Sequence, residues 1–219
     1  MKVEIWSDVV CPWCYIGKRR FEAALEQFEA ADEVEVTWRS FQLNPDHPVG
    51  ARETHDEHLA RKLGVTPTQV HELNERLVAL AAAEGLDYHF ETYVTVNTFD
   101  AHRVTHLAEA LRLGLQIHER LFRAQLVEGE ILDDTETLVR LAAAVGVPEA
   151  DTRRVLASDA YAAEVKADID EARAIGVTGV PFFVLDRRYG ISGAQPAALF
   201  LEALRTAHAG ATAEAGTAG

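Results

Sequence analysis

The sequence predicts an α/β fold that is interrupted by a large all-helical insertion. Strand-like segments occur near the two ends of the chain, over residues 3–6, 34–43, 182–185 and 189–192. Between them, from about residue 51 to 175, apolar residues recur at helical spacing without a strand pattern. We therefore expect one discontinuous α/β domain formed by residues 1–48 and 176–208, an inserted helical subdomain over 49–175, and a disordered tail over 209–219.

The first three elements form a βαβ unit. Residues 3–6 have the pattern of a short strand, and a helix opens at Cys11 and continues toward Glu29. Residues 34–43 (VEVTWRSFQL) alternate in polarity as a second strand does. Because a helix connects the two strands, we expect them to be parallel, with a right-handed crossover.

Helix signals dominate the middle of the chain, and strand signals return at its end. Thr66 and Gln69 form a capping box around Pro67, and Gly85 can end that helix. Five further helices are predicted, from residue 97 or 98 to 114, over 116–127, from 134 to 146, over 148–157, and from 158 or 159 onward, with no strand among them. The segments 182–185 and 189–192 then predict an antiparallel hairpin, followed by a last helix.

The most informative motif is Cys11-Pro12-Trp13-Cys14, at the start of the first helix. Two cysteines three residues apart on one turn face the same side and can close a small disulfide ring. Free N–H groups and the helix dipole favour a thiolate on Cys11, whose pKa is expected to fall from about 8.5 into the range of roughly 3.5 to 7.5. Pro12 suits the first helical position because its missing N–H is not needed there. The motif predicts a dithiol–disulfide redox centre with Cys11 and Cys14 as the catalytic pair.

Two other interpretations of the motif are weaker. A structural zinc site needs four ligands, and the chain has only these two cysteines. His55 with His58 and His102 with His106 have ligand-like spacing, but nine histidines in a polar chain produce such pairs by chance. A purely structural disulfide is disfavoured because a four-residue ring restrains little chain entropy. We therefore predict redox chemistry and no metal.

The composition bounds the class of protein. With 219 residues, 48% of them hydrophobic, the chain can bury a full core. A net charge of −14 argues against a nucleic-acid surface and against binding to anionic membranes. No apolar run reaches transmembrane length, Met1 and Lys2 lead directly into a strand, and the helix that opens at Cys11 begins before a signal-peptide core could fit. We expect a cytoplasmic protein, in a compartment that keeps most dithiols reduced.

The order of these features resembles the thioredoxin superfamily and, within it, DsbA-like proteins that carry a helical insertion. The segments SDVVCPWCYIGKRR, WRSFQLNPD, NTFDAHRV and GVTGVPFFVLDRRYGISGAQP are similar to the FrnE-like branch, over nearly the whole chain to about His208. This branch is similar to kappa-class glutathione transferases and 2-hydroxychromene-2-carboxylate isomerases, which usually keep a serine where this chain has Cys11. The resemblance implies a thioredoxin fold and, since both cysteines are present, a thiol–disulfide oxidoreductase or isomerase.

The resemblance also implies a cis peptide bond between Val180 and Pro181, beside the CPWC turn. A cis X-Pro bond costs little compared with other cis bonds and bends the chain tightly. In this superfamily the turn leaves the backbone of the residue before the proline free to pair with an extended substrate. Val180 is therefore assigned to substrate binding and Pro181 to the catalytic site. From the residues alone, a trans proline at a strand entrance is an equal alternative.

In the expected reaction, Cys11 attacks a substrate disulfide to form a mixed disulfide, which Cys14 then resolves. Pro12 and Trp13 are expected to contact the substrate, because the Trp13 ring offers an apolar stacking surface. We expect no tightly bound cofactor, with glutathione or a cellular dithiol as the reductant. The expected partner is a disulfide-containing protein or a small-molecule thiol, and similarity to the kappa-class proteins suggests a homodimer.

Some polar residues and two other functions complete the predictions. His102 is a candidate to face the cleft between the domains and bind substrate, with a surface or capping role as its alternative. Asp8 either influences the thiols or caps the helix, and Lys18 and Arg19 are expected to be solvated. The competing functions are a glutathione-dependent isomerase or transferase acting on an aromatic, polyketide-like molecule, and a non-catalytic redox sensor.

Overall fold

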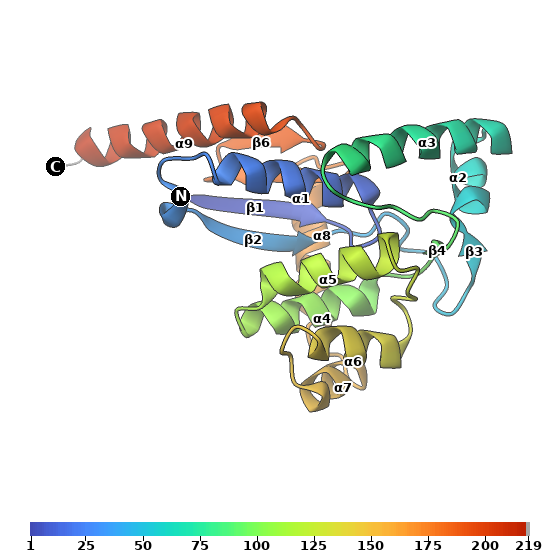
Figure 1. Ribbon diagram of the computed structural model, residues 1–219. Helices are drawn as coiled ribbons and strands as arrows, with labels where there is room; N and C mark the ends of the chain where they lie inside the picture. Colours follow the sequence, from blue (N-terminus) through green and yellow to red (C-terminus); the bar gives the residue numbers. More distant parts are fainter. Residues whose placement is uncertain (218–219) are drawn as a thin grey trace.

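A short mixed sheet forms the centre of the fold. In a computed structural model that describes residues 1–217, the sheet contains β1 (Lys2–Ser7), β2 (Glu35–Ser40), β5 (Phe182–Leu185) and β6 (Tyr189–Ser192), in the order β2-β1-β5-β6. β1 and β2 are parallel and are connected by α1 (Pro12–Leu25), whereas β5 is antiparallel to both β1 and β6 (Figure 1). The predicted βαβ unit and C-terminal hairpin are confirmed.

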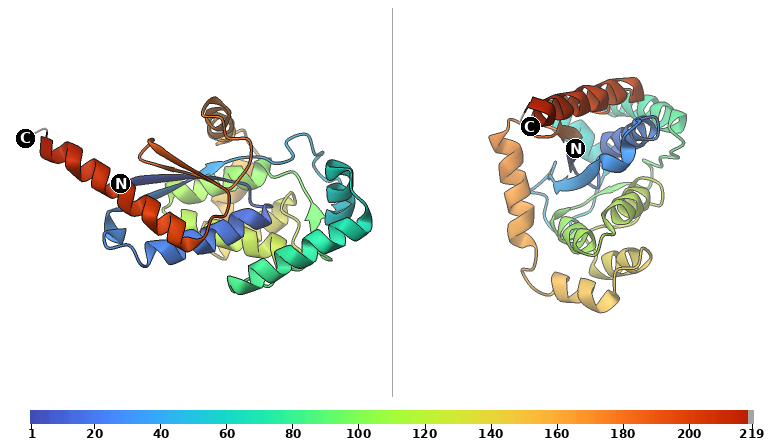
Figure 2. Two further views of the ribbon diagram at one scale, coloured as in Figure 1. Left: turned by 90° about the horizontal axis from the view of Figure 1, so that it is seen from above. Right: turned by 90° about the vertical axis from the view of Figure 1, so that its left-hand side faces the viewer.

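One face of the sheet is covered by α1 and α9 (Ala197–Thr217), as both views of Figure 2 show. Ile5 on β1 lies directly opposite Phe183 on β5. The Phe183 ring centre is 5.5 Å from that of Phe21 on α1 and 4.5 Å from that of Phe200 on α9. Burying each of these side chains contributes roughly 1.5–3 kcal/mol. Helix α1 is therefore fixed to the sheet and to α9 by aromatic packing around Phe21.

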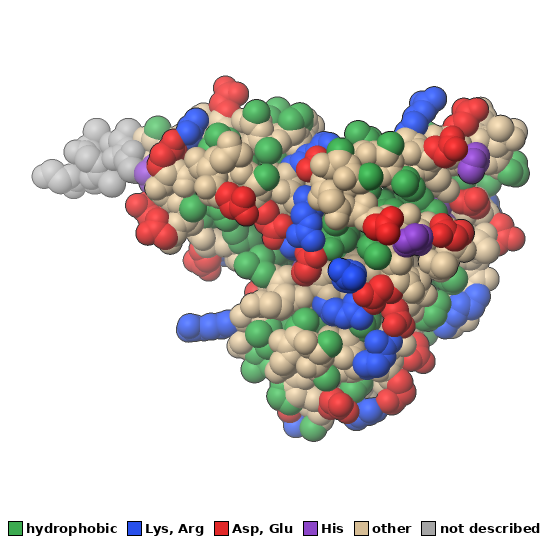
Figure 3. Space-filling view, in the orientation of Figure 1, with side chains coloured by type: hydrophobic (Ala, Val, Ile, Leu, Met, Phe, Trp, Pro, Cys, Tyr) green, Lys and Arg blue, Asp and Glu red, His purple; other side chains and the backbone are tan. Residues whose placement is uncertain are grey.

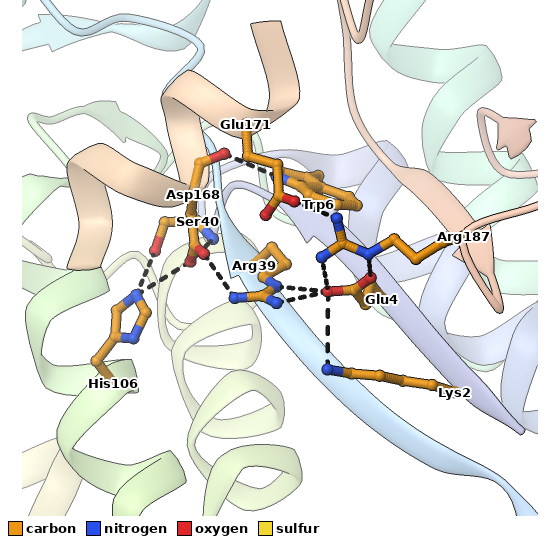
Figure 4. A network of polar contacts seen from close by, with 9 residues as sticks. All are labelled: Lys2, Glu4, Trp6, Arg39, Ser40, His106, Asp168, Glu171 and Arg187. Atoms are coloured by element: carbon orange, nitrogen blue, oxygen red, sulfur yellow. Dashed lines mark hydrogen bonds and ion pairs between the residues drawn. The ribbon is translucent and has the colours of Figure 1, made fainter. Parts of the chain in front are cut away.

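The opposite face of the sheet is joined to α8 (Ala162–Ala174) by a polar network as well as by packing. Alternation along β1 sends Glu4 and Trp6 to this face, where the Trp6 indole N–H donates to the Asp168 carbonyl at 2.9 Å. The carboxylates of Glu4 and Asp168 are buried, so each needs compensating charges or hydrogen bonds. Figure 4 shows their partners: Arg39, Arg187 and Lys2 around Glu4, and Arg39, His106 and the Ser40 N–H around Asp168.

The segment between β2 and β5 is mainly helical, as predicted. Its helices are α2 (His55–Leu63), α3 (Pro67–Ala83), α4 (Phe99–Ala110), α5 (Gly114–Leu126), α6 (Thr135–Ala143), α7 (Glu149–Leu156) and α8, and a 3₁₀ turn (Ala31–Glu33) precedes β2.

Two details of this segment differ from the prediction. Strands β3 (Glu53–Thr54) and β4 (Val94–Thr95) pair within it, so the expectation of no strand there is wrong. Strands of two residues are too short to show a period. The helix α2 was not predicted either, although Thr54 and Glu57 form a capping box at its start, like the one that begins α3.

The limits of the two subdomains stay a prediction, because α8 belongs to the inserted segment in sequence but packs on the sheet. The predicted disordered tail differs from the structure. Helix α9 continues through Thr217, in an alanine-rich stretch that favours helix, and residues 218–219 lie outside the described residues. Among the described residues, no helix has both the length and the apolar character needed to cross a membrane.

Candidate active site

Cys11 is the N-cap residue of α1, with extended backbone angles (φ −86°, ψ 114°), and Pro12 takes the first helical position as predicted. The Cys11 N–H donates to the Asp8 carbonyl at 2.9 Å, and the Cys11 carbonyl accepts the Cys14 N–H at 3.0 Å. Both cysteines are free thiols, and they approach each other to 3.3 Å. The turn thus places Cys11 at the positive end of the helix dipole, within reach of Cys14.

Cys14 lies behind Cys11 and is fully buried. Burial raises the pKa of the Cys14 thiol well above its usual value, and the hydrogen bond and charge of Cys11 raise it further. The Ser7 hydroxyl and the backbone N–H of Asp8 act in the opposite direction on this pKa. Cys14 therefore stays protonated at neutral pH while Cys11 is free.

The loop that contains Val180 and Pro181 closes over the motif. The peptide bond between them is cis, as the resemblance implies, and the Cys11 thiol lies 3.6 Å from the Val180 carbonyl oxygen. Gly17 in α1 permits this approach, because a Cβ atom added there would lie 2.9 Å from Cγ of Pro181. The missing side chain at Gly17 therefore sets the spacing between the helix and the loop.

Two buried tyrosines, neither of them among the predicted site residues, support the motif from the other side. The Tyr88 hydroxyl donates to the Pro12 carbonyl at 2.7 Å, and the Tyr93 hydroxyl donates to the Val10 carbonyl at 2.9 Å. A buried tyrosine hydroxyl usually needs a partner, so the segment LDYHFETYV carried a signal. That signal does not predict which backbone carbonyl accepts the hydrogen bond, because Pro12 and Val10 are far away in the chain.

His102 is buried, which contradicts its predicted contact with substrate. Its ring is 1% exposed and lies 3.3 Å from the carboxylate of Asp8, which is itself fully buried. The second carboxylate oxygen of Asp8 accepts the Leu43 N–H at 2.8 Å. Asp8 therefore connects the turn before the motif to α4, through His102, and to the loop after β2, through Leu43.

Lys18 and Arg19 are also placed differently from the prediction of two solvated cations. Lys18 is 4% exposed, and its ammonium lies 2.7 Å from Glu119 on α5 and 2.6 Å from Glu22. Arg19 pairs with the same two carboxylates and lies over the Tyr15 ring. These contacts join α1 to α5. The sequence does not predict them, because Glu119 lies about 100 residues away in the chain and only the fold brings it beside Lys18 and Arg19.

A cleft of about 540 Å³ opens beside Cys11. One wall contains Cys11, Pro12, Trp13 and Val180, and the other comes from α2 and α3, which lie beyond the N-terminal end of α1 in Figure 1. The α2 and α3 wall is rich in leucine: Leu59, Leu63, Leu73, Leu77 and Leu80. Four of the predicted site residues thus share the cleft, whereas Cys14 and Pro181 lie behind its wall.

One group of potential metal ligands lies outside the dithiol. Donor atoms of His47, Glu53 and His58 all lie within 4.8 Å of one another. Glu53 already pairs with Arg61, and His58 bonds to Glu53 at 2.9 Å and to Asn44 at 3.1 Å. A metal would have to replace these contacts, and the group includes neither cysteine.

The mixed sheet, the dithiol at the start of α1 and the adjacent cis-proline loop define a protein of the thioredoxin fold. The sequence profile of the DsbA-like thioredoxin domain matches residues 2–205, and the chain belongs to this family. A probable DsbA oxidoreductase from Streptomyces coelicolor is 44% identical, and its crystal structure matches with a TM-score of 0.92 over 95% of this chain and 90% of its own.

Two more distant proteins are similar over most of their length. The uncharacterized protein YwbO of Bacillus subtilis is 26% identical over 184 residues, which are 84% of this chain and 86% of that protein. The cytosolic disulfide reductase DsbM of Pseudomonas aeruginosa, in its structure with GSH, is 21% identical, with a TM-score of 0.66 over 94% of this chain and 98% of its own. The second similarity concerns the fold.

Proposed function

We propose that this protein is a thiol–disulfide oxidoreductase that acts through a mixed disulfide on Cys11. The observation that carries the proposal is the different placement of the two thiols. Both thiols are buried, but Cys11 caps the helix and borders the cleft, whereas Cys14 does not border the cleft and has a raised pKa. Such an arrangement gives one cysteine the role of attacking group and the other the role of resolving group.

The proposed reaction balances as a two-electron exchange. Cys11 attacks the substrate disulfide as a thiolate; one substrate sulfur leaves and takes up a proton. Cys14 then loses its proton and attacks the Cys11 sulfur, so the second substrate thiol leaves and the Cys11–Cys14 disulfide forms. Glutathione or a cellular dithiol supplies two electrons to restore the dithiol, and the reverse cycle oxidises substrates.

The contacts of Cys14 explain why resolution follows attack. While Cys11 is free, its charge and its hydrogen bond help to keep Cys14 protonated. Once Cys11 is in a mixed disulfide, both contributions disappear, whereas the Ser7 hydroxyl and the Asp8 N–H remain beside Cys14. The pKa of Cys14 is then expected to fall, although burial, the largest cause, still holds it above its usual value, and Cys14 loses its proton as it attacks.

The backbone of Val180 is the proposed binding element for an extended substrate. Its carbonyl oxygen lies 3.6 Å from the Cys11 sulfur at the cleft wall, and Trp13, which is 42% exposed, adds a stacking surface. A segment that enters the cleft would thus meet backbone acceptors and an aromatic ring beside the reactive sulfur. We retain the cytoplasm as the proposed location and a homodimer as the proposed assembly.

The direct test is insulin-disulfide reduction by dithiothreitol or glutathione, with the wild type, Cys11→Ser and Cys14→Ser. Multiple turnover that disappears in Cys11→Ser and falls strongly in Cys14→Ser supports the proposal. Mass spectrometry of Cys14→Ser should also detect a covalent substrate adduct on Cys11, with the double variant as control. A wild type without turnover and a Cys14→Ser protein without adduct overturn it.

A second candidate function is a glutathione-dependent isomerase or transferase. The apolar cleft and Trp13 favour it, since they suit an aromatic small molecule as well as a peptide. It requires stoichiometric glutathione binding and an activity that survives Cys14→Ser, so the same variants separate the two functions. A redox sensor, in contrast, would oxidise reversibly without multiple turnover.

A further inference from the structure

The active-site cleft differs in charge from the rest of the molecule. The chain contains 35 aspartate and glutamate residues against 21 lysine and arginine residues. None of those carboxylates lines the cleft, whereas Lys62 and Arg76 both do. Two carboxylates contact residues of the wall from behind: Glu53 is paired with Arg61, and Asp56 accepts a hydrogen bond from Asn74 at 2.7 Å. The cleft is therefore a cationic region on a strongly anionic protein.

Neither Lys62 nor Arg76 forms an ion pair among the residues that the structure describes. The Lys62 ammonium donates to Asn44 Oδ1 at 2.9 Å and to the Leu43 carbonyl at 3.3 Å, and both acceptors are neutral. Arg76 is exposed and has no hydrogen bond or ion pair within the part of the chain that the structure describes. Most other lysines and arginines lie within ion-pair distance of a carboxylate. Figure 3 shows this on one face of the molecule, where lysine and arginine side chains (blue) lie beside aspartate and glutamate side chains (red).

The two histidines of the cleft do not change this picture. His55 stacks on Phe90. Burial lowers the pKa of His55, so its ring is neutral at pH 7. His58 is hydrogen bonded to Asn44 and to Glu53, and both contacts hold its ring in the wall. The cationic character of the cleft therefore rests on Lys62 and Arg76.

The apolar part of the cleft has the length of a peptide segment. Leu73, Leu77 and Leu80 follow one another along α3, and seven residues of helix span about 10 Å. Leu63, Leu73 and Leu80 are 53%, 40% and 38% exposed, so the wall is apolar but uncovered. A ligand that matches it is extended, apolar over several ångströms and negatively charged beside the apolar part.

We propose that Lys62 and Arg76 are specificity-determining residues, which select disulfide-bonded peptide segments that combine apolar residues with flanking aspartate or glutamate. The inference rests on the proposed function, because it names the substrate class of the same site. Exposed charge pairs change an equilibrium constant by about two- to fivefold each. Their effect decreases as salt shortens the screening length, and it acts strongly on the rate of association.

The test uses three fluorogenic disulfide peptides with one apolar core and flanking Glu, Gln or Lys residues. The wild type should reduce the Glu peptide with a kcat/KM at least about fivefold above that for the Gln peptide at low ionic strength, and the Lys peptide more slowly than both. The ratio should shrink toward one at 0.5 M salt. Glutathione disulfide serves as an anionic comparator without an apolar core, and it should not share the Glu peptide's advantage.

Variants separate a local effect from the net charge of the chain. Lys62→Gln and Arg76→Gln should each lower the Glu-to-Gln ratio by about two- to fivefold. Lys166→Gln on α8 is the matched control, because it removes one exposed charge that does not line the cleft and should leave the ratio unchanged. An equal loss in Lys166→Gln, a ratio of one in the wild type or a preference for the Lys peptide overturns the inference.

Binding of the same peptides to the Cys11→Ser, Cys14→Ser double variant keeps the two proposals distinguishable. If the wild type reduces none of the peptides, the proposed function fails, and the binding ratios still report the charge preference. If it reduces all three at one rate, the function stands and the charge selectivity is wrong.

Discussion

Gly17 offers a sharp test of how the helix and the cis-proline loop are held together. A Cβ atom at this position would lie 2.9 Å from Pro181 Cγ and 3.5 Å from both Ala194 Cβ and Phe183 Cζ. Non-bonded carbon atoms normally stay about 3.5–4.0 Å apart, so Gly17→Ala requires a shift of roughly 0.6–1.1 Å. The neighbours on two sides are packed, and the least constrained response is displacement of the loop away from Cys11.

The expected magnitudes follow from two opposing contributions. Replacing a helical glycine by alanine gains about 1 kcal/mol, whereas overpacking a filled core costs about 1–3 kcal/mol. The free energy of unfolding should therefore fall by about 0–2 kcal/mol, or about 0–8 °C in Tm for a domain of this size. Because displacement of a reacting geometry by about 1 Å can cost up to a hundredfold, insulin reduction should slow at least tenfold.

Gly210→Ala in α9 is the matched control, since the added Cβ atom would meet only ordinary contacts, at 3.6 Å from the Tyr189 hydroxyl. It should raise Tm by about 2–4 °C and leave turnover unchanged. The assays are thermal unfolding followed by circular dichroism, and insulin reduction under identical conditions. The reasoning is refuted if Gly17→Ala raises Tm as Gly210→Ala does and keeps full turnover.

Three further predictions concern buried groups. Tyr93→Phe leaves the Val10 carbonyl without its partner and should cost about 1–3 kcal/mol of unfolding free energy in urea denaturation; an unchanged midpoint would contradict this. In Cys11→Ser, burial still raises the pKa of Cys14. The rate of Cys14 alkylation by iodoacetamide should therefore be very low at pH 7 and rise about tenfold per pH unit up to pH 9. A rate that reaches a plateau below pH 8 would contradict the raised pKa. Burial lowers the pKa of His118 to about 3, from about 6.5 in the unfolded chain, so its neutral form is favoured in the fold. The contribution of His118 to the free energy of unfolding is complete above pH 6.5, and about 3 kcal/mol of it is lost at pH 4.5. His118→Gln should remove this pH dependence of stability, and equal acid sensitivity of the wild type and the variant would contradict the low pKa of His118.

The sequence by itself determined the parts of the fold that depend on neighbours in the chain. The N-cap position of Cys11 and the first helical position of Pro12 follow from local backbone chemistry, and the βαβ unit follows from periodicity and connection length. Capping boxes also mark the starts of α2, with Thr54 and Glu57, and of α3, with Thr66 and Gln69. The motif and the location of the candidate site were therefore visible before any tertiary contact was known.

Only the tertiary structure decided what surrounds the dithiol. The tyrosine hydroxyl that bonds to Pro12 comes from Tyr88, and the carboxylate that buries Lys18 comes from Glu119 on α5. The role of His102 was fixed in the same way, by the approach of α4 to Asp8. Such pairs have no local signature, because they arise when apolar packing of separate helices brings polar groups together and burial then makes each partner necessary.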